Sequence, residues 1–281
     1  TNTTLASLAD TQMAALTTTQ MAALTTTQVG ALTATNAAAL TTTQIAALTN
    51  TQIGGLNATD IGELSTTQVA ALSATQLARL DTAAAGAFDA TQIGALNATQ
   101  VRGLTVTQLA ALDAADIAEF TTTQIAGMTT TQLRAFDATQ VAAFAETQIA
   151  ALTTTQLQAF TTTNLSAFTD TQAAALTTTQ ISSLLASQVA GLAAADIAEF
   201  TNTQLAALTT TQVRSLTQTT LGALVDTQIA AFTGTQLQAI SSTALVALAD
   251  SQIGALTATQ VAALNTSQVR AFTAGTIGAL T

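Results

Sequence analysis

The sequence repeats with a period of eight residues along its whole length. Residues 17–24, TTTQMAAL, are followed by TTTQVGAL in residues 25–32, and 35 such octads fill residues 1–280. Every octad ends in a large hydrophobic residue, which is Leu in 24 octads, Phe in 9, and Met128 and Ile240 in the other two. Because no insertion shifts this frame, the pattern predicts a quasi-one-dimensional solenoid in which each repeat contacts mainly its neighbours.

Each octad has the features of a short helix. With Thr17 as the first position and Leu24 as the eighth, the first position is Thr, Ser, Asp or Asn in 29 octads and the fourth is Gln in 25. This is the spacing of a capping box at a helix start. The fifth position is Met, Val, Ile or Leu in 32 octads, and it shares a helix face with the eighth. Each octad is therefore predicted to form about two turns of amphipathic helix.

A single continuous helix does not fit this period. Eight residues turn about 800°, so the apolar stripe would drift by about 80° per octad. We therefore predict an all-α solenoid of short helices, one per octad. A β-solenoid is the alternative because Thr is a good strand former, although strict alternation would put Ile45 and Leu48 on opposite faces. Residues 1–281 are expected to form one continuous solenoid, and the repeat sequence at both ends suggests a segment of a longer repeat protein.

A sparse pattern of charged residues indicates how many octads make one coil. Asp replaces Gln at the fourth position, and Glu occupies the seventh, only in residues 57–64, 113–120 and 193–200. Two octads after each block comes an arginine, at Arg79, Arg134 or Arg214. This spacing favours two octads per coil, with each Glu beside the following Arg on the next coil. Three octads per coil is the alternative register, and duplication of one ancestral unit is the alternative origin of the spacing.

The remaining positions divide into packed and exposed ones. The third is Thr in 28 octads, whereas the second accepts many residue types, so we expect the third to be packed and the second to be exposed. The Gln column is expected to complete capping boxes, and side-chain ladders between coils are the alternative. Only the second position would then be free for a hydroxyl array, which makes an ice-binding surface a lesser alternative for the function.

Few residues are candidates for binding or catalysis. The chain has no Cys and no His, which excludes disulfides and the usual ligands of zinc, haem and iron–sulfur clusters. Asp113, Asp116 and Glu119 could offer oxygens to Ca²⁺, but calcium sites use six to eight oxygens and a Gly-bearing loop. Acidic residues at a helix N-terminus are the simpler interpretation. With no partner base, nucleophile or pocket in view, we expect no enzyme activity, no cofactor and no metal.

The charge balance excludes several kinds of partner. Five arginines against fifteen carboxylates give a net charge of −10, which disfavours nucleic acid and anionic membranes. Thr and Gln interrupt every apolar stretch before the roughly 18 to 20 residues that a membrane span needs. No signal-peptide pattern precedes the repeats. We therefore expect neither nucleic-acid binding nor membrane insertion.

Residues 40–48, LTTTQIAAL, resemble the tandem LTxxQ repeats of large bacterial surface and secreted proteins. The resemblance covers the whole chain and implies an extracellular or cell-surface location in a bacterium. It also implies a structural role as a stalk, matrix fibre or adhesin spacer. The expected partner is the protein itself, as a homo-oligomer or filament, because end coils of a solenoid expose an apolar face. The alternative function is a binding scaffold for a surface protein or a glycan.

Overall fold

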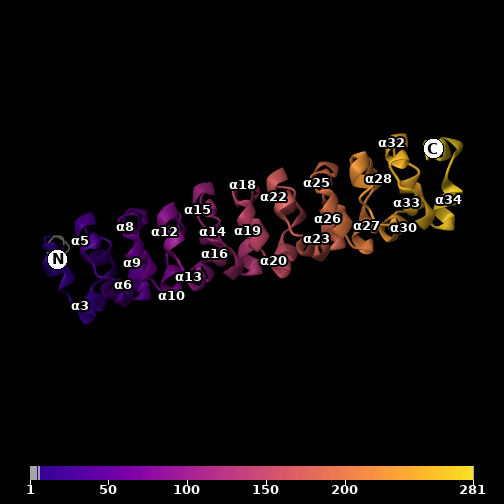
Figure 1. The fold of residues 1–281 in the computed structure, drawn as a ribbon. Helices are drawn as coiled ribbons and strands as arrows, with labels where there is room; N and C mark the ends of the chain where they lie inside the picture. The colour runs from indigo at the N-terminus through magenta and orange to yellow at the C-terminus, as the bar shows by residue number, and fades with distance from the viewer. Residues whose placement is uncertain (1–4, 6, 281) are drawn as a thin grey trace. The chain divides into compact units, whose positions relative to one another are not determined.

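The computed structural model describes Leu5 and residues 7–280, and the octads among them form short α-helices (Figure 1). The chain divides into two compact units, Thr1–Ala151 and Leu152–Thr281. No strand occurs in the part of the chain that is described. The prediction of an all-α solenoid of short helices is thus confirmed in each unit, and the β-solenoid alternative is not.

The helices follow one another with the octad period. Those of the first unit are α2 (Asp10–Ala14), α3 (Thr18–Ala23), α4 (Thr26–Val29), α5 (Ala34–Ala39), α6 (Thr42–Ala47), α7 (Asn50–Ile53), α8 (Ala58–Gly62), α9 (Thr66–Ala70), α10 (Ala74–Leu77), α11 (Thr82–Ala85), α12 (Ala90–Ala95), α13 (Ala98–Gly103), α14 (Val106–Leu109), α15 (Ala114–Ala118), α16 (Thr122–Gly127), α17 (Thr130–Leu133), α18 (Ala138–Ala142) and α19 (Glu146–Ala151). Those of the second unit are α20 (Thr154–Ala159), α21 (Thr162–Leu165), α22 (Asp170–Ala175), α23 (Thr178–Ser183), α24 (Ala186–Gly191), α25 (Ala194–Ala198), α26 (Asn202–Ala207), α27 (Thr210–Ser215), α28 (Gln218–Gly222), α29 (Asp226–Ile229), α30 (Gly234–Ala239), α31 (Ser242–Leu245), α32 (Asp250–Gly254), α33 (Ala258–Ala263), α34 (Thr266–Ala271) and α35 (Ala274–Ala279).

Two extended residues make each corner between helices. After α6 the chain passes through Leu48 at φ −60°, ψ 134° and Thr49 at φ −70°, ψ 157°, and then enters α7. No described residue has a positive φ, and none of the described peptide bonds is cis. Extended backbone suits a β-branched residue such as Thr. The corners therefore need neither Gly nor Pro, which explains how a chain without proline turns so often.

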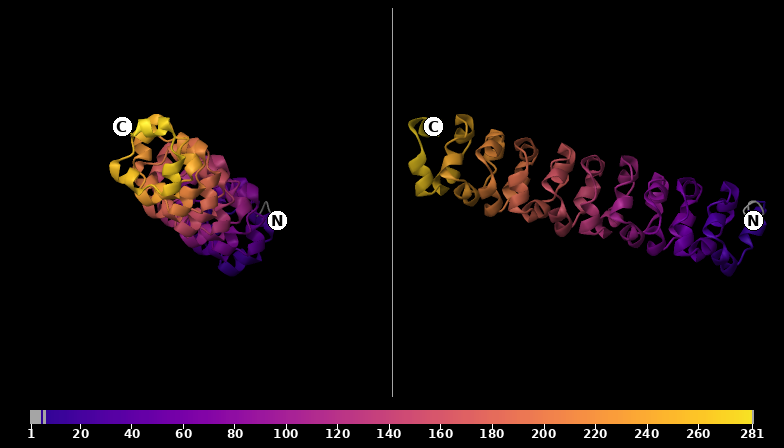
Figure 2. Two further views of the ribbon diagram at one scale, coloured as in Figure 1. Left: turned by 90° about the vertical axis from the view of Figure 1, so that its right-hand side faces the viewer. Right: turned by 180° about the vertical axis from the view of Figure 1, so that it is seen from behind.

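One coil contains three octads, or 24 residues. In the first unit α10 packs against α13 and α13 against α16, and in the second unit α24 packs against α27 and α27 against α30. Figure 2 shows the coils stacked along each unit. The prediction of two octads per coil is therefore wrong. Two helices per coil would require the chain to reverse fully at every corner, and two extended residues turn it less sharply than that.

The longer coil also removes the predicted Glu–Arg pairing. Glu63 follows α8, which packs against α11, whereas Arg79 follows α10. Likewise α25 packs against α28, whereas Arg214 lies in α27. An arginine two octads after a glutamate thus belongs to a different side of the coil, and this prediction fails with the register on which it was built.

The fifth and eighth positions form the core, as the amphipathic pattern indicates. Ile45 is 1% exposed and Leu48 is 4% exposed, and the intervening small residues face outward or toward a neighbouring coil. The expectation for the polar positions is wrong, because third-position Thr43 is exposed whereas fourth-position Gln44 is buried. Third-position hydroxyls instead lie beside the cap, as in the 3.0 Å hydrogen bond between Ser65 Oγ and Thr67 Oγ1. The packed polar residue of the octad is its glutamine.

None of the described helices has the length and apolar character required to cross a membrane.

Candidate functional site

The fourth-position glutamine performs two tasks with one side chain. In the first unit, Gln108 Oε1 accepts the backbone N–H of Thr105 at 2.7 Å, which is the capping-box bond. Its Nε2 donates to the carbonyls of Leu77 at 2.8 Å and Leu80 at 2.7 Å, which lie 31 and 28 residues earlier. We call this arrangement the amide bridge. It joins the start of one helix to the end of a helix in the preceding coil.

The same bridge is present in the second unit. Gln236 Oε1 accepts the N–H of Thr233 at 2.7 Å, and Nε2 donates to the carbonyls of Leu205 at 2.9 Å and Leu208 at 2.7 Å. An amide is required because one atom must accept and the other must donate, which a carboxylate cannot do. The Gln column therefore both caps helices and links coils, where the sequence analysis expected capping alone.

The amide bridge satisfies groups that a short helix leaves open. The last carbonyls of a helix have no partner within it, and in a helix of four to six residues they are most of the carbonyls. Each buried bond contributes about 1 kcal/mol, and leaving a buried partner unsatisfied costs about 1–3 kcal/mol. No buried side-chain nitrogen or oxygen lacks a partner among the described residues. Helices too short to be stable alone are thus held by their neighbours.

Three octads carry aspartate in place of this glutamine, at Asp60, Asp116 and Asp196. We call these the Asp corners. Asp60 Oδ2 still accepts the N–H of Asn57 at 2.8 Å, so the cap is retained. An ionised carboxylate has no hydrogen to donate to the preceding coil, however. Burial raises the pKa of Asp60 and of Asp116, because both carboxyls are removed from water.

The predicted calcium candidates lie in one of these corners. Asp113 caps α15, with Oδ1 accepting the N–H groups of Ala115 at 2.8 Å and Asp116 at 3.0 Å. Asp116 Oδ2 accepts the N–H of Asp113 at 3.0 Å, and Glu119 is exposed at the helix end. These bonds use the carboxylate oxygens on the backbone. Across Leu5 and residues 7–280 no three His, Cys, Asp or Glu residues form a group that could hold a metal ion.

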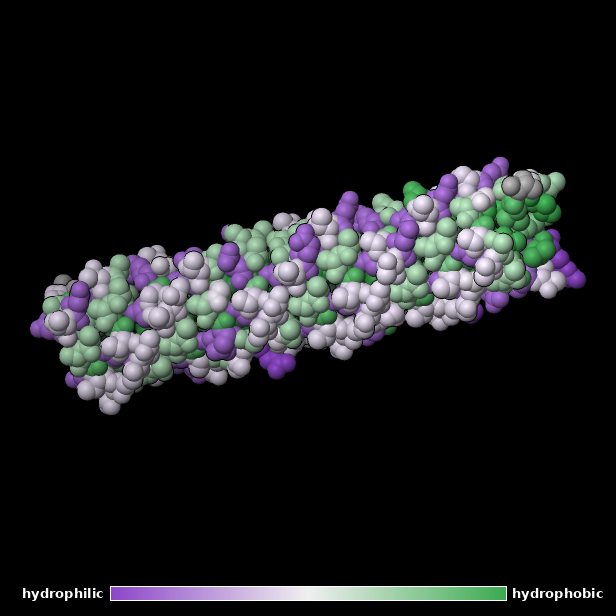
Figure 3. Space-filling view, in the orientation of Figure 1, coloured by the Kyte–Doolittle hydropathy of each residue, from purple (hydrophilic) through white to green (hydrophobic). Residues whose placement is uncertain are grey.

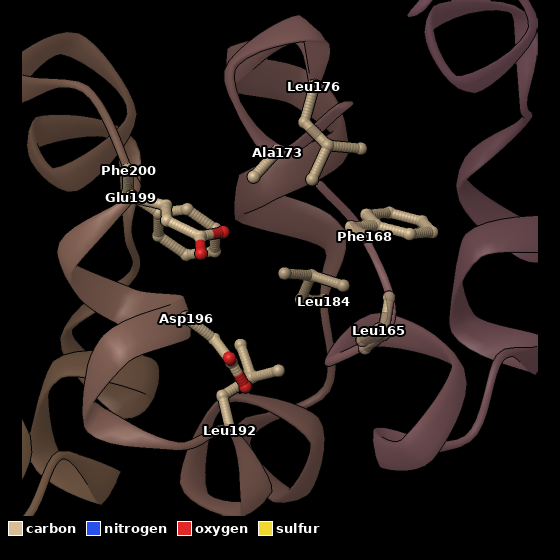
Figure 4. A pocket seen from close by; sticks show the side chains of 9 residues that line it. All are labelled: Leu165, Phe168, Ala173, Leu176, Leu184, Leu192, Asp196, Glu199 and Phe200. Carbon is tan, nitrogen blue, oxygen red and sulfur yellow. The ribbon is translucent and has the colours of Figure 1, made fainter. Parts of the chain in front are cut away.

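Two Asp corners adjoin small apolar cavities. The cavity beside Asp196 has a volume of about 10 Å³ and is shown with its lining in Figure 4; that lining is Leu165, Phe168, Ala173, Leu176, Leu184, Leu192, Asp196, Glu199 and Phe200. An equivalent cavity of about 20 Å³ lies beside Asp60. In both, the fifth position of a neighbouring octad is alanine, Ala173 or Ala37, instead of a larger hydrophobic residue. The missing side chain accounts for the space, which is about the volume of one water molecule.

The corner at Asp196 gathers further polar groups. Ser166 Oγ donates to Asp196 Oδ2 at 2.5 Å, and the N–H of Ala193 donates to the same oxygen at 2.9 Å. Figure 4 shows the side chains of Asp196 and Glu199 extending from the region of α25 toward the lining residues. Burial, and then the charge and hydrogen bond of Asp170, raise the pKa of Glu199 to about 7. Glu199 can therefore gain or lose a proton near neutral pH.

Sequence reasoning did not find Ser166 and Asp170. They precede Asp196 and Glu199 by 30 and 29 residues, and neither belongs to an Asp/Glu block. Their signal is a separation slightly longer than 24 residues, the length of one coil. It becomes visible only when the coil is known to contain three octads.

Comparisons with known proteins agree with a repeat architecture. The ALTTAQ repeat family matches residues 117–154 of this chain. The comparison with curated proteins gives no match. The matched residues cover four successive octads and part of a fifth, so this stretch is similar to a known repeat, and the protein is a helical repeat protein.

Proposed function

We propose that this chain is a structural protein without catalytic activity, which acts as a spacer or forms a self-assembling filament. The amide bridge is the observation that carries the proposal. In both units it links coil to coil by buried hydrogen bonds at the same separations, and these bonds add to the continuous core of fifth and eighth positions. A solenoid linked in this uniform way is suited to bearing load along its coils.

We further propose that the protein acts outside the cell, at a bacterial surface. Two similarities support this location: the likeness of residues 40–48 to the LTxxQ repeats of bacterial surface proteins, and the match of residues 117–154 to the ALTTAQ repeat. Immunogold labelling of intact cells that produce the protein tests it. Label on the outer surface is expected, and label confined to the interior of sectioned cells contradicts the location.

Electron microscopy of the purified protein tests the structural role. We expect filaments with an axial repeat as the concentration increases. Particles of a single short length at every concentration would contradict self-assembly and leave only the spacer role. That role predicts stepwise lengthening when a single molecule is pulled from its two ends, because coils held by separate amide bridges open one after another.

A groove between adjacent coils favours a second candidate, the binding scaffold. In the second unit it has a volume of about 560 Å³ and polar lining that includes Arg214, Ser241, Ser242, Asn265 and Thr266. In the first unit a groove of about 660 Å³ lies at the equivalent corner. Screening against a glycan array, with Thr266→Arg as the blocked control, tests this candidate. Binding that the substitution abolishes would support it, and a blank array would contradict glycan recognition.

A further inference from the structure

The first coils present amide donors that no carbonyl receives. Gln12, Gln20 and Gln28 each accept the backbone N–H three residues earlier, at 2.9, 2.8 and 2.8 Å, as in every capping box. No residue stands 28 or 31 positions before them in the sequence, and their Nε2 atoms make no hydrogen bond among the described residues. Gln12 and Gln20 are exposed, whereas the glutamines of interior coils are buried. This face has one half of an amide bridge.

The last coil presents the other half. Its helices α33, α34 and α35 end in carbonyls that receive no glutamine amide, because the last bridging glutamine, Gln268, donates to Leu237 and Ile240. The fifth-position residues of this coil are also uncovered. Val269 is 51% exposed and Ile277 is 57% exposed. Figure 3 shows hydrophobic residues gathered at this end of the second unit.

The two faces match in both chemistry and spacing. One has three free donors and the other has three pairs of free acceptors with exposed apolar side chains. Within each unit, the same donors and acceptors pair whenever a coil follows another, at separations of 28 and 31 residues. The fifth position is covered in the same step, as for Ile229, which is 0% exposed. The 281 residues thus contain both halves of one interface.

We propose that a second copy of this chain docks its first coils on the last coil of another copy, in the register that continues the octads without a break. This inference rests on the proposed structural function and names the partner and the contacts. Counting the second copy onward from residue 280 keeps both separations. The resulting bonds run from Gln12 to the carbonyls of Val261 and Leu264, from Gln20 to those of Val269 and Phe272, and from Gln28 to those of Ile277 and Leu280.

The unbroken register is the one that uses all three donors. A shift by one octad outward would leave Gln28 without a carbonyl, because no octad follows residues 273–280. The interface is heterologous, since different surfaces of the two copies meet, and such a contact continues into an open chain of molecules if it does not close into a ring. Docking also removes Val269 and Ile277 from water, which favours association.

Disulfide trapping tests this register directly, because the natural chain has no cysteine. Within a unit, a residue at the seventh position lies against the second position 29 residues earlier; a Cβ on Gly127 would come within 2.9 Å of the Ala98 Cβ. In the proposed interface the equivalent pair is Ala23 of one copy and Ala274 of the other. We expect chains bearing Ala23→Cys and chains bearing Ala274→Cys to form a mixed disulfide dimer on mild oxidation.

Ala258→Cys is the matched control. Ala258 occupies the same octad position as Ala274 and is also exposed, but it lies on a different helix of the same coil. We expect Ala23→Cys to pair with Ala274→Cys at least tenfold more than with Ala258→Cys. Equal trapping of the two, or none of either, would overturn the register. If microscopy shows filaments while the Ala23–Ala274 disulfide is absent, this inference fails and the structural function stands.

A charge placed on the apolar face provides a second test. Val269→Glu with Ile277→Glu puts carboxylates at exposed sites, so the fold should persist, which circular dichroism can check. We expect sedimentation of the natural chain to show association with rising concentration, and the double variant to associate at least tenfold more weakly. Val225→Glu is the control, since Val225 is 60% exposed at the start of α29 and away from the last coil. A natural chain that stays monomeric, or an equal loss in the control, would contradict the proposal.

Discussion

The Asp corners at Asp60 and Asp196 are one local structure placed in two units, seventeen octads apart. Each has aspartate where most octads have the bridging glutamine, and each adjoins a small cavity caused by an alanine at a fifth position. Their carboxyls also make the same capping bond, to the N–H of Asn57 at 2.8 Å and of Ala193 at 2.9 Å. Within the octad the two corners are nearly interchangeable.

Residues of the preceding coil make the two corners different. Gly30 and Ala34 occupy in the first unit the places that Ser166 and Asp170 occupy in the second, 136 residues later. Burial and Asp60 raise the pKa of Glu63, whereas Glu199 also faces Asp170 and its pKa reaches about 7. The electrostatics of an octad are therefore set by residues about 30 positions away as much as by its own residues.

Converting an ordinary corner into an Asp corner should have the largest effect. In Gln108→Asp the cap is retained, but the bonds to the carbonyls of Leu77 and Leu80 are lost and a carboxylate is placed opposite them. We expect the free energy of opening the surrounding helices, measured by hydrogen exchange, to fall by about 2–4 kcal/mol. Gln218→Asp makes the same chemical change at an exposed site. An equal effect in both variants would show that the amide bridge contributes nothing.

The reverse change should stabilise the first unit. Asp60→Gln supplies an amide that can reach the carbonyls of Val29 and Leu32 at the usual separations, and it removes a partly buried carboxyl. We expect a gain of about 1–2 kcal/mol at pH 7. Because burial raises the pKa of Asp60, the natural corner is more stable in acid. The gain from glutamine should therefore shrink as the pH falls, and a gain that grows instead would contradict this account.

The smallest effect should be a pH dependence confined to the second unit. A raised pKa means that the folded state favours protonated Glu199, so its contribution to stability is full below its ordinary pKa of 4.5 and is lost as the pH rises to about 7. Asp170→Asn removes the nearest charge and should lower the pKa of Glu199, which a carboxyl NMR titration measures directly.

The first unit provides the converse of that experiment. Ala34→Asp places a carboxylate where Asp170 stands in the second unit, and it should raise the pKa of Glu63 further. Asp10→Asn, a change far from both glutamates in sequence, is the control and should leave both titrations unchanged. If Ala34→Asp does not move the titration of Glu63, the difference between the corners does not come from the preceding coil.

Much of the fold could be predicted because its causes are local. The capping bond joins residues three apart, as from Thr105 to Gln108, and the apolar pair Ile45 and Leu48 is also three apart. Residue types at such spacings indicate helix starts and buried faces directly. The third-position threonine misled the analysis, since its uniformity reflects hydrogen bonds beside the cap and not burial.

The sequence by itself determined the octad: where each helix starts, which two positions are buried, and that the array is helical. Only the tertiary structure decided that three octads make a coil, and this decided which residues meet. The physical reason is that the angle of a corner is a backbone property that residue spacing does not encode. A small difference in that angle changes which residues 28 to 31 positions apart come into contact. The second task of the glutamine and the meeting of Asp170 with Glu199 both depend on it.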